Sequence, residues 1–379
     1  MKILQISASY KPAYIYGGPT MSVSKLSEQL VKIGSDVKVF TTTANGAAEL
    51  PVGGNTPQNV DGVSVRYFDR VTKDHSHFSP QLLIALWKEV RSFDVVHIHA
   101  WWNLVSVLSC LVALLRKVPV IISPRGTLST YSFANNHVFV KKILHAIIGR
   151  PLLSRCNMHT TSEREQVAIA RSVRSKHIFT IHNFVAMPAN VPVISNQTPE
   201  TLRLLFFSRI DQKKGLEILL SALKDVSIPY RLTIAGGGDE AYISILKALS
   251  KQYQIDSYID WIGFVNSNKF EMIAEHDLLV LPSYDENFAN VVIESLSVGT
   301  AVLMSEEVGL AKYVKSKNLG WICKTNMLSI KSRLEEIYFN SIALNTIREQ
   351  APPIISNDFN ENKLIIQYLE MYKQINRYE

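Results

Sequence analysis

Short apolar runs alternate with longer stretches of helical spacing along the first half of the chain. Residues 2–7 (KILQIS) and 37–42 (VKVFTT) are strand-like, and between them residues 20–33 place apolar side chains three or four positions apart. This alternation predicts a parallel sheet whose strands are joined by crossover helices. The other strands expected in this half are VSVRYF, VVHIHA, VPVIIS, MHTTS and HIFTIHN.

The same alternation restarts after residue 200. The strand patterns there are RLLFFSR, LTIAGG, IDWIGF, LLVLPS, AVLMS and GWIC, each followed by a helical stretch. Between the halves, PANVPVISNQTPE has three prolines and no periodicity, as a linker does. We therefore predict an α/β protein with two Rossmann-like, doubly wound domains. Its predicted parts are an N-terminal domain at 1–187, a linker at 188–200, a C-terminal domain at 201–358, and a closing helix at 359–379 that could pack on either domain.

Length and composition agree with two cores. A chain of 379 residues with 47% apolar content is too long for one ordinary core. The cysteines, Cys110, Cys156 and Cys323, lack the spacing of a disulfide framework or a zinc site, which favours a reducing compartment. The N-terminal apolar stretch is too short for a signal peptide, and the longest apolar run, residues 104–115, is too short for a membrane span. A cytoplasmic protein is therefore expected.

Two glycine clusters follow expected strands, which is where doubly wound sheets bind their ligands. Gly17 and Gly18 precede a proline at a predicted helix start, so a phosphate or sugar could approach backbone N–H groups there. A simple turn explains this pair as well. Residues 236–239 (GGGD), with Gly237 second, also permit close approach of an anion. They lack the GxGxxG spacing of a dinucleotide site, which argues against a nicotinamide enzyme.

Charged side chains follow two expected strands of the second domain. SRIDQKKG places Arg209 and Lys214 near a helix N-terminus, an arrangement suited to a diphosphate. Glu286 follows LLVLPS, and Glu294 comes eight residues later in a predicted helix. Two ionised carboxylates can accept hydrogen bonds from a sugar's hydroxyls and from a ribose diol. They also suit the helix dipole without any ligand, which is the structural alternative.

Together and in order, these motifs resemble glycosyltransferase family 4, retaining enzymes of the GT-B fold that include glycosyltransferases of bacterial surface polysaccharides. The family's pattern of Glu, seven residues and Glu matches Glu286 and Glu294, and its Arg and Lys match Arg209 and Lys214. The N-terminal Gly-Gly, DVVHIHA, the TSE segment at 161–163 and HNFV at 182–185 also fit. The resemblance covers nearly all of the chain and implies two Rossmann-like domains facing across a cleft.

By this resemblance, Glu286 would contact the donor sugar, Glu294 the ribose, and Arg209 and Lys214 the diphosphate. The other residues expected at the donor are Gly17, Gly18, Arg125, Gly237, Asn290 and Val291, with Gly263, Phe264 and Val265 at the base. Many relatives carry a sugar-contacting His in an S-P-H-G-like turn, whereas residues 123–126 here read S-P-R-G. Arg125 is therefore expected to touch a charged or differently substituted group. His99, at a strand end, is a candidate acceptor or sugar contact, although a packed histidine is the alternative.

No Asp recurs two residues after another Asp, so the metal-binding DxD pattern of the other major glycosyltransferase fold is missing. We therefore expect hexose transfer with no metal and no cofactor, from a UDP- or GDP-sugar donor, with Arg209 and Lys214 stabilising the leaving diphosphate. The resemblance implies retention, with a leaving phosphate oxygen taking the acceptor's proton. Two alternatives stay open: a sugar-nucleotide epimerase of the same fold, and a non-catalytic nucleotide-sugar-binding subunit.

The basic charge lies in the first half. The net charge of +7 divides into 21 Lys+Arg against 10 Asp+Glu in residues 1–190, and 19 against 23 in residues 191–379. No recognition motif of a nucleic-acid binder accompanies it, so no nucleic-acid partner is expected. VFVKKILHAIIGRPLLSR, residues 138–155, interleaves cations with apolar residues, a pattern typical of helices on anionic membranes and also of helices packed on a sheet. We therefore expect a glycan or lipid-linked acceptor and reversible docking of a cytoplasmic protein on the inner membrane face.

Overall fold

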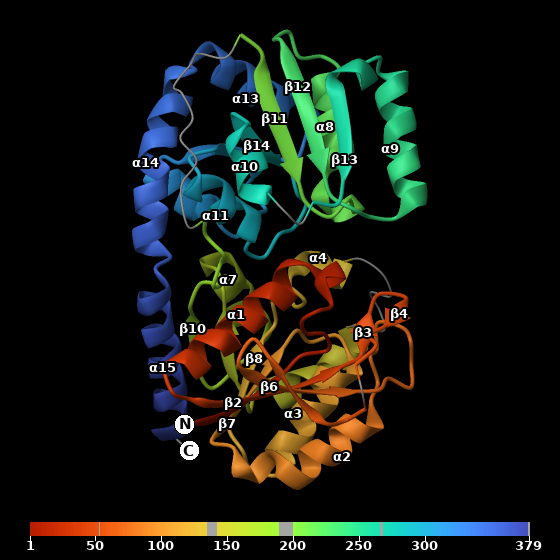
Figure 1. The fold of residues 1–379 in the computed structure, drawn as a ribbon, viewed down its shortest axis with the longest axis vertical. Helices are drawn as coiled ribbons and strands as arrows, with labels where there is room; N and C mark the ends of the chain where they lie inside the picture. Colours follow the sequence, from red (N-terminus) through yellow and green to blue (C-terminus); the bar gives the residue numbers. More distant parts are fainter. Residues whose placement is uncertain (53, 135–141, 189–199, 266–267, 378–379) are drawn as a thin grey trace. The chain divides into compact units, whose positions relative to one another are not determined.

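The computed structural model describes residues 1–379 except 53, 135–141, 189–199, 266–267 and 378–379. The chain forms two compact units (Figure 1). The N-terminal unit comprises Met1–Phe184 together with Glu361–Glu379, and the C-terminal unit comprises Val185–Asn360. The chain therefore leaves the N-terminal unit once and returns to it for its last helix.

An eight-stranded sheet forms the centre of the N-terminal unit. Its order is β10-β9-β8-β7-β1-β2-β6-β5, and all neighbours pair in parallel except β5 and β6. The strands are β1 (Lys2–Ile6), β2 (Asp36–Thr42), β5 (Pro57–Val60), β6 (Val63–Phe68), β7 (Val95–His99), β8 (Val120–Ser123), β9 (Asn157–Thr160) and β10 (Ile178–Thr180). A separate antiparallel ribbon joins β3 (Ala44–Asn45) and β4 (Ala48–Glu49).

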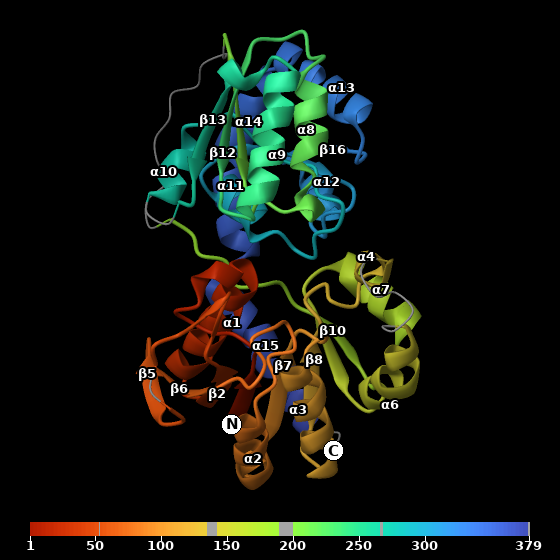
Figure 2. The ribbon, with the colours of Figure 1, turned by 90° about the vertical axis from the view of Figure 1, so that its right-hand side faces the viewer.

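Helices cover both faces of this sheet. They are η1 (Tyr14–Tyr16), α1 (Gly18–Lys32), α2 (Pro80–Glu89), η2 (Val90–Ser92), α3 (Leu104–Leu115), α4 (Thr130–Ala134), η3 (His145–Gly149), α6 (Arg150–Leu153), α7 (Glu163–Ser172) and α15 (Glu361–Arg377). Successive strand residues point to opposite faces. Leu4 thus joins the core beneath α2 and α3, which lie side by side in Figure 2, while Ile3 joins the core beneath α1 and α15.

α15 belongs to the N-terminal unit. Its apolar side chains Leu364, Tyr368 and Tyr372 are buried there. Phe359 instead lies in the core of the C-terminal unit, with its ring against that of Phe288. The closing helix therefore begins at Glu361 and not at 359, because Phe359 ends the preceding helix and packs with the other unit.

The C-terminal unit contains a six-stranded parallel sheet of order β13-β12-β11-β14-β15-β16. Its strands are β11 (Leu202–Phe207), β12 (Tyr230–Ala235), β13 (Ile259–Gly263), β14 (Leu278–Leu281), β15 (Ala301–Ser305) and β16 (Gly320–Cys323). Its helices are η4 (Gln212–Lys214), α8 (Leu216–Leu223), α9 (Glu240–Gln252), η5 (Asp256–Tyr258), α10 (Lys269–Ala274), α11 (Asn290–Ser297), α12 (Ala311–Lys317), α13 (Met327–Phe339) and α14 (Ile342–Asp358). The strand order reverses between β11 and β14.

The predicted fold class, two Rossmann-like α/β domains, is confirmed. The expected linker at 188–200 lies mostly outside the described residues, and the C-terminal unit already begins at Val185. The predicted amphipathic stretch at 138–155 begins outside them as well. Its described part includes a π-helical turn at His145–Gly149, followed by α6. Within the described residues, no helix is both long enough and apolar enough to cross a membrane.

Candidate active site

The loops after β11 and β14, where the strand order of the C-terminal unit reverses, carry two lysines and two carboxylates that pair with one another. In doubly wound sheets, ligands bind beyond the carboxyl ends of the strands at such a switch point. The loop after β11 leads into η4, where the Asp211 side chain accepts a hydrogen bond from the Lys213 N–H. The Tyr284 N–H, in the loop after β14, donates to the Lys213 carbonyl over 2.9 Å. The two loops are therefore held together by their backbones.

Two lysine–carboxylate pairs join these loops. Lys214 pairs with Glu286, and both side chains stay partly accessible. Lys213 pairs with Asp285 over 2.8 Å, and the Asp285 side chain is nearly buried. The backbone of Glu286 is fixed on both sides, because its N–H donates to the carbonyl of Glu307 and its carbonyl accepts from Gly309. The Glu286 carboxylate is thus presented beside an ammonium group by a rigid loop.

Arg209 is the exposed cation of the same loop. It makes no hydrogen bond or ion pair with any residue that the structure describes. The neighbouring Ile210 N–H donates to the Gly237 carbonyl over 2.8 Å, which joins this loop to the glycine triplet after β12. Arg209 therefore stands beside a glycine turn and can bind an anion without breaking an existing pair.

The three glycines after β12 differ in the space around them: two are closely packed against backbone, and one has open space beside it. A Cβ on Gly236 or Gly238 would lie 1.8 or 2.1 Å from a backbone oxygen of the loop after β11. Both glycines are thus required by packing. At Gly237 the nearest atom would be the Cβ of Phe264, at 3.9 Å. Gly237 is the member of the triplet that leaves room for a ligand.

The loop after β13 places an aromatic ring beside this open glycine. The Gly236 N–H donates to the Gly263 carbonyl over 2.7 Å. Phe264 is 68% exposed, whereas the next residue, Val265, packs against the core. An exposed ring in such a loop can stack on a flat nucleobase.

Helix α11 carries the second glutamate. It begins at Asn290 after Ala289, which has a positive φ of 68° that is uncommon for a residue with a side chain. Val291 packs against the core. Glu294, one turn in, pairs with Lys269 of α10 over 2.8 Å. A ligand hydroxyl that bound Glu294 would share this carboxylate with a lysine.

In the N-terminal unit, Gly17 and Gly18 stand at the start of α1. Gly17 is the N-cap residue with a φ of 64°, and Gly18 opens the helix. Apart from its own chain neighbours, no atom of the described residues lies within 4 Å of the position that a Gly17 Cβ would take. The positive φ favours glycine here, and the surrounding space admits a ligand.

Arg125 and His99 contact each other at the carboxyl ends of β8 and β7. The Arg125 Nε donates to His99 Nδ1 over 3.2 Å, and Arg125 Nη1 donates to the Asn183 side chain over 2.9 Å. His99 is 2% exposed, and its Nε2 bonds to Gln5 over 2.7 Å. Both ring nitrogens of His99 are therefore occupied, so it is placed to orient Arg125 and not to contact a sugar itself.

The structure brings some of the candidate residues together. Lys214 pairs with Glu286, Arg125 bonds to His99, and Phe264 lies next to Gly237. No hydrogen bond or ion pair among the described residues joins Gly17 and Gly18 to Arg125, or Glu294 to Glu286. Asp285 and Lys269 had not been singled out from the sequence. The DE pair at 285–286 and the lysine at the start of α10 were visible, but only the folded loops show that each forms an ion pair.

Two Rossmann-like domains with a cluster of cations and carboxylates at a switch point are typical of GT-B glycosyltransferases. Residues 16–187 match the family described as Glycosyltransferase Family 4, and residues 186–352 match Glycosyl transferases group 1. An uncharacterized glycosyltransferase of Methanocaldococcus jannaschii is 26% identical over 359 residues, which cover 87% of each chain. The protein belongs to glycosyltransferase family 4.

Solved structures share the fold over the full length. Sucrose-phosphate synthase from Thermosynechococcus elongatus matches with a TM-score of 0.78 and 17% identity, covering 100% of both chains. HepE of Anabaena, in complex with UDP-glucose, matches with a TM-score of 0.78 and 17% identity, covering 99% of this chain and 100% of the other. At this identity the likeness concerns the fold.

Proposed function

We propose that this glycosyltransferase moves a hexose from a UDP-sugar to an acceptor hydroxyl with retention, in polysaccharide or glycolipid assembly. The observation that carries the proposal is the Lys214–Glu286 pair at the switch point of the C-terminal unit, together with Arg209 of the same loop as Lys214, which has no partner among the described residues. HepE, which shares the fold, was solved with UDP-glucose, which supports uridine over guanosine.

In the proposed reaction the bond between the anomeric carbon and the diphosphate oxygen breaks, and a bond to the acceptor oxygen forms on the same face. The acceptor hydroxyl passes its proton to the leaving phosphate oxygen. Arg209 and Lys214 stabilise the charge that grows on the diphosphate. Glu286 binds sugar hydroxyls, Glu294 the ribose, and Phe264 the base, while Gly237 leaves space for the ligand.

Ligand binding tests the donor. UDP and UDP-glucose should raise the melting temperature of the protein, because a ligand bound only by the folded state stabilises it. GDP and GDP-mannose, at the same concentrations, serve as controls and should raise it less. The assignment to a uridine donor fails if the guanosine compounds give the larger shift. The transferase proposal fails if no nucleotide sugar binds.

Sugar transfer should persist in excess EDTA. The proposed mechanism assigns the charge on the diphosphate to Arg209 and Lys214, so it needs no divalent cation. Initial rates with and without EDTA measure this directly. Loss of activity that Mg²⁺ or Mn²⁺ restores would contradict the metal-free mechanism.

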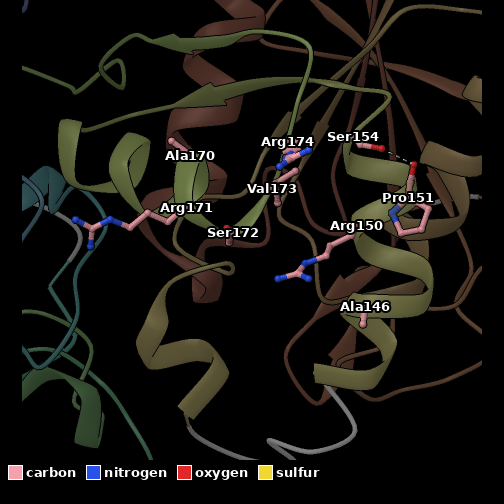
Figure 3. Close-up of a pocket in the computed structure, with 9 residues that line it drawn as sticks. All are labelled: Ala146, Arg150, Pro151, Ser154, Ala170, Arg171, Ser172, Val173 and Arg174. Carbon is pink, nitrogen blue, oxygen red and sulfur yellow. Dashed lines mark hydrogen bonds between the residues drawn. The ribbon is translucent and has the colours of Figure 1, made fainter.

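The surface around η3 and α6 supports docking on an anionic membrane. Four apolar side chains here are 40–69% exposed: Ile143, Leu144, Ile147 and Ile148. Beside them lies a hollow of about 490 Å³ whose lining includes Arg150, Arg171 and Arg174. Arg150 extends into the hollow, whereas Arg171 points away from it (Figure 3). Apolar side chains next to cations are suited to lipid tails and headgroups.

The full-length protein should sediment with anionic vesicles and much less with neutral ones, and high salt should weaken this binding. Ile147→Glu should lower the bound fraction at least about fivefold, since it adds a charge that anionic lipids repel. Ile245→Glu, in the C-terminal unit at 63% exposure, is the matched control. Equal, negligible binding to both vesicle types would favour a soluble acceptor instead.

A further inference from the structure

A buried chain of polar side chains crosses four adjacent strands of the N-terminal sheet. Its members are Gln5 of β1, His97 and His99 of β7, Ser123 of β8, His159 of β9 and Tyr372 of α15. The contacts are His99–Gln5 at 2.7 Å, Gln5–Tyr372 at 3.1 Å, Tyr372–His97 at 2.7 Å, His97–Ser123 at 2.6 Å, Ser123–His159 at 2.6 Å and His159 to the Ile181 carbonyl at 3.0 Å. This chain of hydrogen bonds begins at Arg125, which donates to His99.

When the imidazoles are neutral, the donor and the acceptor of each hydrogen bond in this chain can be assigned in only one way. Arg125 can only donate, so His99 Nδ1 accepts and His99 Nε2 donates to the Gln5 carbonyl oxygen. The Gln5 amide then donates to the Tyr372 hydroxyl. Burial lowers the pKa of each histidine in the chain, that of His159 to about 3, which keeps the rings neutral.

The far end of the chain imposes the same direction. The Ile181 carbonyl can only accept, so His159 Nε2 carries the proton and His159 Nδ1 accepts from Ser123. Ser123 in turn accepts from His97 Nε2, which leaves His97 Nδ1 to accept from the Tyr372 hydroxyl. Every bond therefore donates away from Arg125, and aligned bonds of this kind polarise and strengthen one another.

This arrangement holds Arg125 in place without cancelling its charge. Its guanidinium is bound by a neutral imidazole and an amide, and forms no ion pair with a described carboxylate. Nearby Glu165 accepts hydrogen bonds from the backbone N–H groups of Gly126 and Thr161. Arg125 itself adopts a positive φ of 52°, a conformation that costs free energy in a residue with a side chain.

One nitrogen of Arg125 is left for a ligand. Nε and Nη1 bind His99 and Asn183, while Nη2 has no hydrogen-bond partner among the described residues and is not an enclosed atom. Arginines of low exposure are normally paired with an anion, because an unpaired buried charge is costly. The missing anion is then expected from outside the protein.

We infer that Arg125 selects a substrate carrying an oxyanion, a carboxylate or a phosphate, and that the chain from His99 to Tyr372 orients its guanidinium for this contact. The inference rests on the proposed function, because it assigns the substrate class of that transfer. The oxyanion has two sources, a uronate on the donor sugar or a phosphate on the acceptor.

Paired ligands distinguish these sources in the full-length protein. Calorimetry compares UDP-glucuronate with UDP-glucose, and separately glucose 6-phosphate with glucose. In one pair, the anionic member should bind about 10- to 100-fold more tightly, the scale of one hydrogen bond to a charged group. Arg125→Gln should abolish this preference, and Arg125→Lys should retain part of it. Arg91→Gln, the same charge change at an exposed site of the same unit, should retain it fully.

Tyr372→Phe tests the orienting chain, since it removes one hydroxyl far from the ligand and leaves Arg125 intact. It should reduce the anionic preference severalfold while the affinity for UDP stays unchanged. The inference is overturned if the wild-type protein shows no preference in either pair, or if Arg125→Gln keeps it. If Arg125→Gln does not fold, Arg125→Lys and Tyr372→Phe still decide. Failure to bind UDP would count against the proposed donor instead, because the glucose 6-phosphate pair needs no nucleotide.

Discussion

Glu286→Ala should lower the rate of sugar transfer by about three orders of magnitude or more and leave the protein folded. The side chain is partly accessible and pairs with Lys214, while the backbone of this residue is held independently by Glu307 and Gly309. The loop should therefore survive the loss of the carboxylate. In the proposed mechanism the substitution removes the acceptor of the sugar hydroxyl groups at the reacting centre, an effect on the scale of removing an electrostatic catalytic group. Initial rates, with circular dichroism as the check on folding, measure this.

Two further variants make the Glu286 result interpretable. Glu286→Gln keeps the shape and the carbonyl oxygen but removes the charge, so activity between wild type and Glu286→Ala would separate hydrogen bonding from charge. Glu271→Ala, an exposed acidic residue of the same unit, should transfer sugar at the wild-type rate. A folded Glu286→Ala protein with near-normal activity would falsify the role assigned to this residue.

Arg209→Ala and Lys214→Ala should each lower kcat by about two to three orders of magnitude, the usual scale for one donor that stabilises transition-state charge. The two differ in their surroundings. Arg209 has no partner within the described part of the chain, so its loss leaves no orphaned group. Removal of Lys214 also deprives Glu286 of its ion pair. The double variant of Lys214 and Glu286 should therefore cost less than the sum of the single effects.

Kinetic controls complete this experiment. Lys251→Ala changes an exposed lysine on α9 and should leave kcat unaltered. Arg209→Lys keeps a cation but loses bidentate geometry, so an intermediate rate is expected. Wild-type rates for both alanine variants would place the diphosphate elsewhere. An increase in KM with unchanged kcat would show that the cations bind the ground state without favouring the transition state.

Much of the fold follows from periodicity alone. Buried parallel strands such as LLVLPS are continuous apolar runs, and the helices between them repeat every three to four residues, so both sheets were foreseeable. The edge strand β5 could not be predicted in this way. Its sequence PQNV has no apolar alternation, because an edge strand paired on one side can remain largely exposed.

The candidate site was predictable where it depends on position along a strand. Lys214 and Glu286 each follow a strand at the switch point, so their meeting follows from topology. The pairing of Glu294 with Lys269 depends instead on how α10 sits against α11. The series of hydrogen-bonded side chains that starts at Arg125 could not be predicted from the sequence. Gln5 and Tyr372 are 367 positions apart, and nothing local in the sequence connects them.

The return of α15 to the N-terminal unit makes the C-terminal unit an insertion within the other. A chimera that exchanged everything after residue 184 would replace α15, and with it the Tyr372 hydroxyl that bonds to His97. An exchange confined to residues 185–360 would keep both. Recombination that gives this fold a new C-terminal unit therefore needs two junctions, and the last helix must be inherited with the first strand.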